Sequence, residues 1–170
     1  VHGDAERRRE VMKDTTVGVG AVLAVALVVA GLALAALALA GISLLAAVGI
    51  VVAAEVGAKL GMAALACLGV PAHEGLGSQF TADNGARSLV PPALLALPVL
   101  ALMWPSLAAA GAVVGALLAV GAVGRWSNCA LGGVGGDAFG ATNEIGRLAG
   151  LYGGLIAWEL FPEVIAWTPS

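Results

Sequence analysis

Five long apolar stretches separated by short polar segments organise this chain of 170 residues. The first, residues 17–40, carries no charged residue and is long enough for about 36 Å of helix, against a hydrocarbon core of about 30 Å. The pattern predicts an all-α, polytopic membrane bundle, a single membrane domain over residues 1–170. About five transmembrane helices are expected, at residues 17–40, 41–68, 88–104, 106–124 and 141–161.

Several of these stretches contain residues that a plain lipid-spanning helix does not need. Glu55 and Lys59 are spaced i, i+4, which places both on one face of the second helix. Prolines at 91, 92 and 98 predict a distorted or irregular third helix. The fourth stretch has Gly111, Gly115 and Gly121 among alanines, a spacing of small residues that favours close helix contact.

Composition supports the membrane interpretation. Sixty per cent of the residues are hydrophobic and 11% are charged, whereas soluble domains are usually about 25% charged. The net charge is −3 and no basic stripe is present, so a nucleic-acid partner is not expected. The lipid bilayer is therefore the expected partner, and a cell membrane the expected location.

The polar segments at residues 1–16, 71–87 and 125–146 contain the Lys and Arg residues expected between helices. Because Lys and Arg gather in cytoplasmic loops, five spans place all three segments on the cytoplasmic face, whereas the opposite turns carry neither residue. We therefore expect these three segments to meet over one site.

Each of the three segments holds an acidic residue beside glycines, at Asp14, Glu74 and Asp137. Glycine-rich turns bring backbone N–H groups close to an anion, and carboxylates with substrate phosphates suit Mg²⁺. The combination indicates phosphate chemistry, although the glycines could equally be turn and helix-contact residues.

Asp137 and Glu144 are seven residues apart and share a helix face if a helix begins near Asp137. Asp137 could alternatively cap the last helix. Glu144 lies just inside an apolar stretch, where a carboxylate is costly and commonly functional. The same reasoning applies to Glu55 and Lys59, unless they simply neutralise each other.

Three motifs, in order, resemble the cobalamin synthase family, also called adenosylcobinamide-GDP ribazoletransferases. MKDTTVGVG resembles the family's M-x-D-x-x-x-G segment, EGLGSQF its E-G-L-G-x-x-F loop, and LGGVGGDAFGATNE its G-G-x-T-G-D-x-L-G-A-x-x-E motif. In the third motif Val134 and Gly135 replace x-Thr and Phe139 replaces Leu, which leaves any hydroxyl contact there without its donor.

The resemblance implies site residues. Catalytic carboxylates would be Asp14, Asp137 and Glu144, and the metal, Mg²⁺, would be held by Asp14 and Asp137. Lys59 falls where the family usually has Arg, and Asn84 and Arg87 are further candidates for nucleotide contacts. Together the substrate-binding candidates are Lys59, Glu74, Gly75, Gly77, Asn84, Arg87, Gly132, Gly133, Gly136 and Gly140.

The family also has an aspartate-rich D-G-L-A-D segment N-terminal to the M-x-D motif. That segment does not occur here, so we expect this chain to be the C-terminal portion of a longer protein, with the main metal motif upstream of Val1 and with activity depending on it.

The activity implied is the joining of adenosylcobinamide-GDP and α-ribazole, or its 5′-phosphate, into adenosylcobalamin, or its phosphate, with release of GMP. The alternative is a small-solute transporter or channel with Glu55, Lys59 and Glu144 along its pathway. A transporter predicts matched helix interruptions in two halves of the sequence, and no internal repeat is apparent.

Overall fold

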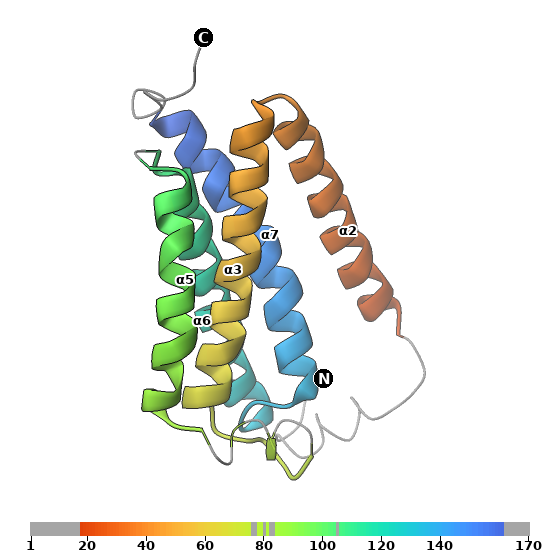
Figure 1. The fold of residues 1–170 in the computed structure, drawn as a ribbon. Coiled ribbons are helices and arrows are strands. Elements are labelled where there is room, and N and C mark those ends of the chain that lie inside the picture. Colours follow the sequence, from red (N-terminus) through yellow and green to blue (C-terminus); the bar gives the residue numbers. More distant parts are fainter. Residues whose placement is uncertain (1–17, 76–77, 80, 82–83, 105, 162–170) are drawn as a thin grey trace.

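Helices form the described architecture, and helices that follow one another along the chain run in opposite directions along the bundle (Figure 1). The computed structural model describes residues 18–75, 78–79, 81, 84–104 and 106–161. The all-α prediction is confirmed. The elements are α2 (Val19–Ala40), α3 (Leu44–Leu68), the 3-10 helix η1 (Ala86–Leu89), α5 (Val90–Leu102), α6 (Ala108–Leu131) and α7 (Gly136–Leu160).

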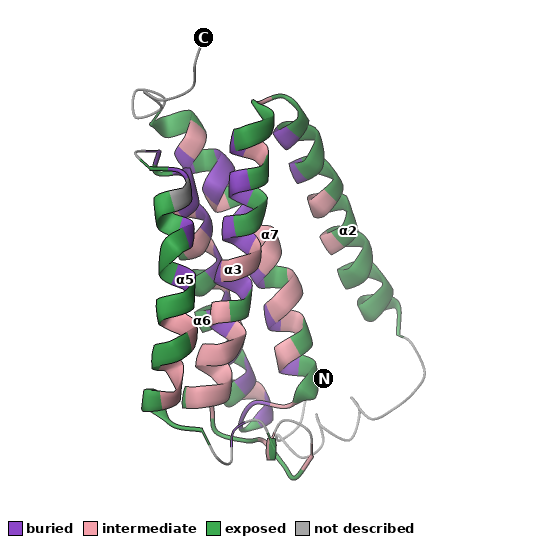
Figure 2. Cartoon of the chain, in the orientation of Figure 1, coloured by how far each residue is buried: buried purple, intermediate pink, exposed green. Residues whose placement is uncertain are grey.

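The core lies where α3, α6 and α7 pack against one another, and its side chains are small. Figure 2 shows buried residues on the facing sides of these helices and exposed residues on the outer surfaces. A Cβ added at Gly57 of α3 would lie 2.9 Å from the Cβ of Ala116 on α6. A Cβ at Gly115 would lie 2.5 Å from the carbonyl oxygen of Ala149 on α7. The small residues therefore allow close helix contact, as predicted.

Helix α2 lies outside this core and contacts mainly α7 (Figure 1). The hydroxyl of Tyr152 donates a hydrogen bond of 3.1 Å to the carbonyl oxygen of Gly31, over which the side chain of Leu148 also packs. Most large apolar side chains of α2 remain exposed, such as Val19 at 86% and Leu37 at 71%. An apolar outer surface of this extent is unfavourable in water and suits hydrocarbon.

Three of the described helices, α2, α3 and α6, are long and apolar enough to cross a membrane. α5 has only 13 residues, although it continues the apolar segment that starts in η1. α7 has 25 residues but includes Asp137, Glu144, Arg147 and Glu159. These features indicate a multi-pass membrane protein, and they distinguish three clear spans from two less typical helices.

The sequence prediction was wrong about where the fourth helix ends and the last one begins. The polar segment starting at Arg125 was expected to be a loop, with the last helix from residue 141. Instead α6 continues to Leu131 and α7 starts at Gly136. Polar residues do not end a helix by themselves, whereas Gly132, with φ of 77°, adopts the left-handed conformation that ends α6. Only residues 132–135 separate the two helices.

Prolines shape the start of the third apolar segment, much as predicted. The segment opens with the 3-10 turn η1, and α5 follows with Pro91 in its first turn, where the missing N–H carries no penalty. Pro98 lies inside α5. The second helix begins at Leu44, and Ser43 caps it by accepting a 3.3 Å hydrogen bond from the Ala46 N–H.

Candidate functional site

Two of the three polar segments are joined directly at one end of the bundle. The N–H of Val134, between α6 and α7, donates to the carbonyl of Val70 at 2.7 Å, and the N–H of Ala72 donates back to Val134 at 3.1 Å. Pro71 and Val134 thereby form an isolated parallel bridge. The expectation that residues 71–87 and 125–146 meet is confirmed for their described parts. Residues 1–16, including Asp14, lie outside the described residues.

Gly133 makes this junction possible. Its φ is 154°, a value that residues with side chains rarely adopt, and an added Cβ would lie 2.6 Å from both the Ala72 nitrogen and the Val70 oxygen. The carbonyl of Gly133 accepts a 2.6 Å hydrogen bond from the buried hydroxyl of Ser127 on α6. The loop between α6 and α7 is therefore fixed both to α6 and to the segment after α3.

Asp137 lies in the first turn of α7, exposed beside this junction. The N-cap is Gly135, which supplies no side-chain hydrogen bond, so the alternative that Asp137 is the N-cap residue is wrong. The first N–H groups of a helix lack partners within the helix and carry its positive end, which together favour an anion. The site thus offers backbone N–H groups next to a carboxylate.

His73, which was not among the predicted site residues, lies against the same helix start. Its Nε2 is 3.7 Å from the position that a Cβ of Gly135 would occupy, and its Nδ1 is 2.9 Å from the carbonyl oxygen of Glu74. The next residue, Gly75, is held in a turn by the Ser78 hydroxyl, which accepts from its N–H at 3.0 Å and donates to its carbonyl at 2.7 Å. The loop carrying Glu74 is thereby folded toward α7.

Four of the glycines predicted to bind substrate divide into two kinds. Gly132 and Gly133 have positive φ and are needed by the backbone itself. Gly136 and Gly140, in contrast, have nothing within 4 Å of an added Cβ, so packing does not demand glycine there. Because glycine inside a helix costs about 1 kcal/mol relative to alanine, these two positions suit the close approach of a ligand. Gly77 lies outside the described residues.

Two further predicted contacts, Asn84 and Arg87, lie at the same end of the bundle. Both are exposed, and Arg87 is in η1, immediately before α5. Within the described ranges, no three His, Cys, Asp or Glu side chains gather closely enough to hold a metal ion. Proteins commonly hold Mg²⁺, the predicted cation, with one or two carboxylates together with substrate oxygens.

A second polar cluster lies between α3 and α7, farther into the bundle. Arg147 forms ion pairs with Glu55 on α3 and, at 3.1 Å, with Glu144 one turn earlier on α7. The side-chain amide nitrogen of Asn143 donates to the other Glu144 oxygen at 2.7 Å, and Lys59 donates to the side-chain oxygen Oδ1 of Asn143. Lys59 also lies 3.7 Å from Glu55. Mutual neutralisation of Glu55 and Lys59 is thus only part of a five-residue network.

The predicted site residues therefore fall into two groups rather than one. Seven residues separate Asp137 from Glu144, a rise of about 10.5 Å along the helix. Both oxygens of Glu144 are already engaged by Asn143 and Arg147. Sequence reasoning missed Arg147, although a basic residue three positions after Glu144 in an apolar stretch was the available signal.

These features define a multi-pass helical membrane protein with a glycine-rich, acid-bearing site at one end of its bundle. Over residues 1–155 the chain matches the family described as cobalamin-5-phosphate synthase. The chain belongs to this family. No solved structure matches it significantly.

Three relatives share the name adenosylcobinamide-GDP ribazoletransferase. The protein from Halobacterium salinarum is 52% identical, with 94% of this chain and 80% of that protein covered. The relative from Halorubrum lacusprofundi is 47% identical over 95% of this chain and 66% of its own length, and that from Haloquadratum walsbyi 41% identical over 91% and 61%. Family membership favours a transferase over the transporter alternative.

Proposed function

We propose that this chain forms the membrane domain of an adenosylcobinamide-GDP ribazoletransferase of cobalamin biosynthesis. The observation that carries the proposal is the junction of Val70 and Ala72 with Val134, because it brings the Glu74 loop to the start of α7, where Asp137 lies. Both loops contain the motifs that resemble the family, and the relatives carry the enzyme's name. In this proposal the motif end faces the cytoplasm.

The proposed reaction transfers a phosphoryl group that carries cobinamide. A ribose hydroxyl of α-ribazole, or of its 5′-phosphate, attacks the phosphorus attached to cobinamide. A new phosphorus–oxygen bond forms, the bond to the bridging oxygen of the GDP group breaks, and GMP leaves with that oxygen. The hydroxyl proton passes to a base or to water. Positioning of the two substrates supplies much of the rate in transfers of this kind.

The residues at the start of α7 suit the pyrophosphate of the first substrate. The open backbone at Gly136 and Gly140 lets phosphate oxygens approach the helix, whose N-terminal N–H groups favour negative charge. Asp137 would hold Mg²⁺ together with those oxygens, and the bound cation would neutralise the charge of the leaving GMP. Asp14 is a further candidate for metal binding.

Glu144 and Lys59 act differently in this proposal. Because the network engages both, they hold α3 against α7 and thereby fix the position of Asp137. They are positioning residues rather than groups that touch the reacting atoms.

Asp137→Asn tests the proposal. In membranes carrying the full-length protein, GMP release from adenosylcobinamide-GDP and α-ribazole should fall by about 10²-fold or more, because the neutral amide that replaces the carboxylate binds neither a divalent cation nor a proton well. Glu159→Gln is the matched control, since Glu159 is an exposed acid at the other end of α7 and should leave turnover unchanged. Near-normal turnover of Asp137→Asn would remove Asp137 from the site.

A further inference from the structure

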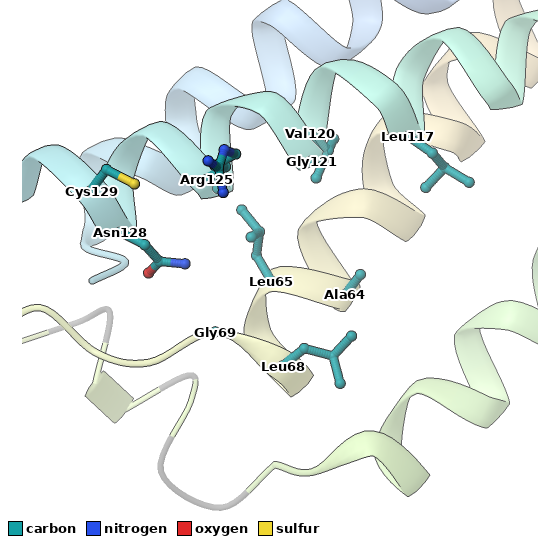
Figure 3. A pocket seen from close by; sticks show the side chains of 11 residues that line it. Ala64, Leu65, Leu68, Gly69, Leu117, Val120, Gly121, Arg125, Asn128 and Cys129 are labelled. Carbon is teal, nitrogen blue, oxygen red and sulfur yellow. The ribbon is translucent and has the colours of Figure 1, made fainter. Parts of the chain in front are cut away.

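A groove of about 480 Å³ runs between the C-terminal halves of α3 and α6 (Figure 3). Its walls are aliphatic along most of its length, formed by Leu65 and Leu68 of α3 and by Leu117 and Val120 of α6. Toward the end of α6 the walls become polar, with Arg125, Asn128 and Cys129. The groove is thus apolar inside and cationic at the end that lies near the motif loops.

The polar end of the groove shares its walls with the loop junction. Gly69 lines the groove, and the next residue, Val70, accepts the hydrogen bond from Val134. Asn128 also lines it, and the neighbouring Ser127 donates to Gly133 from the same turn of α6. A molecule in the groove would therefore have one end beside the segment that bears Asp137.

We propose that this groove binds the ribazole substrate, with the benzimidazole ring between the leucines and the ribose end at Arg125 and Asn128. The inference rests on the proposed function. Its volume falls within the ~300–1,000 Å³ of typical small-molecule sites. That volume suits a flat aromatic nucleoside and is much too small for a corrinoid carrying GDP, so the groove distinguishes the two substrates by size.

The polar groups complement the ribose end of such a ligand. Arg125 forms no ion pair with any other described residue, in contrast to Arg147 and Lys59, which the network engages. A guanidinium can hydrogen-bond a 5′-phosphate in a bidentate manner or stack on an aromatic face. The Asn128 amide offers both a donor and an acceptor to ribose hydroxyls. Charge and shape therefore favour the same orientation.

Gly121 permits a test that does not disturb the fold. It lines the groove, and an added Cβ would meet nothing within 4 Å, so the side chain of Gly121→Leu begins in open space and is chosen to occupy the groove. Gly20→Leu is the matched control, because Gly20 is also a helical glycine in open space but lies on α2. Arg125→Gln provides a second, exposed variant that keeps hydrogen-bonding capacity but removes the charge.

The measurements are direct binding of α-ribazole to the detergent-solubilised protein and the KM for each substrate. Gly121→Leu should weaken ribazole binding and raise its KM about tenfold or more, with the KM for adenosylcobinamide-GDP unchanged. Arg125→Gln should weaken binding of ribazole 5′-phosphate more than that of the free nucleoside. Gly20→Leu should behave as the unmodified protein.

Ribazole binding that Gly121→Leu leaves intact would overturn the inference. So would a phospholipid that copurifies with the unmodified protein and is lost from Gly121→Leu, while the KM for ribazole stays constant. Because ribazole binding is measured without turnover, the groove inference and the proposed function can be refuted independently of each other. A full-length protein that binds ribazole in the groove but releases no GMP would refute the proposed function alone.

Discussion

Replacing Gly115 with alanine should destabilise the bundle, although alanine is the better helix former. The new Cβ would lie 2.5 Å from the carbonyl oxygen of Ala149, whereas ordinary contacts begin near 3.4 Å. Helices α6 and α7 must therefore separate locally by about 1 Å. Overpacking of this kind costs about 1–3 kcal/mol, and the gain in helix propensity is about 1 kcal/mol. The expected net loss of unfolding free energy is the difference of the two, about 0–2 kcal/mol.

Gly121→Ala on the same helix isolates the packing effect. An added Cβ at Gly121 has open space. The variant therefore gains up to about 1 kcal/mol from the higher helix propensity of alanine, with no steric cost. Equilibrium unfolding in mixed micelles of dodecyl maltoside and dodecyl sulfate would compare the two variants with the unmodified protein. Equal shifts for both variants would refute the close approach of α6 and α7 at Gly115.

Two further predictions concern the network and the glycines of α7. Arg147→Met should lower the unfolding free energy by about 1–3 kcal/mol, since Glu144 loses its counter-ion and Glu55 keeps only Lys59, 3.7 Å away. In a double-mutant cycle with Glu55→Gln, the second change should recover part of that loss; purely additive effects would contradict the ion pair between α3 and α7. Gly136→Ala should reduce turnover, measured by GMP release, and leave the thermal unfolding temperature unchanged. Gly133→Ala should reduce turnover and also lower the unfolding temperature. A lower unfolding temperature in Gly136→Ala would contradict the open space around Gly136.

The helices, and the end of the bundle at which each connecting segment lies, could be predicted from the sequence because a lipid bilayer constrains a spanning segment strongly. A spanning segment must satisfy its own backbone and present apolar side chains, so uncharged runs such as residues 17–40 are visible in one dimension. Counting spans then placed the loops near Glu74 and Asp137 at the same end of the bundle, and the described residues confirm this.

The contacts between helices could not be predicted in the same way. The network of Arg147 with Glu55 depends on the relative rotation and register of α3 and α7, which hydrophobic patterning does not determine. The predicted end of α6 was wrong because the segment that starts at Arg125 contains polar residues yet remains helical up to Leu131. The junction at Val134 could not be predicted either, because hydrogen bonds between backbone groups require no particular side chains.

The stoichiometry of the reaction tests the central claim most directly. Membranes carrying the protein would be supplied with adenosylcobinamide-GDP, with and without α-ribazole, and GMP and cobalamin product would be quantified together by mass spectrometry. A ribazoletransferase site at the motif end predicts one GMP for each cobalamin formed, no GMP without ribazole, and loss of both products in Asp137→Asn. GMP release that does not need ribazole, or cobalamin formation that Asp137→Asn leaves intact, would contradict it.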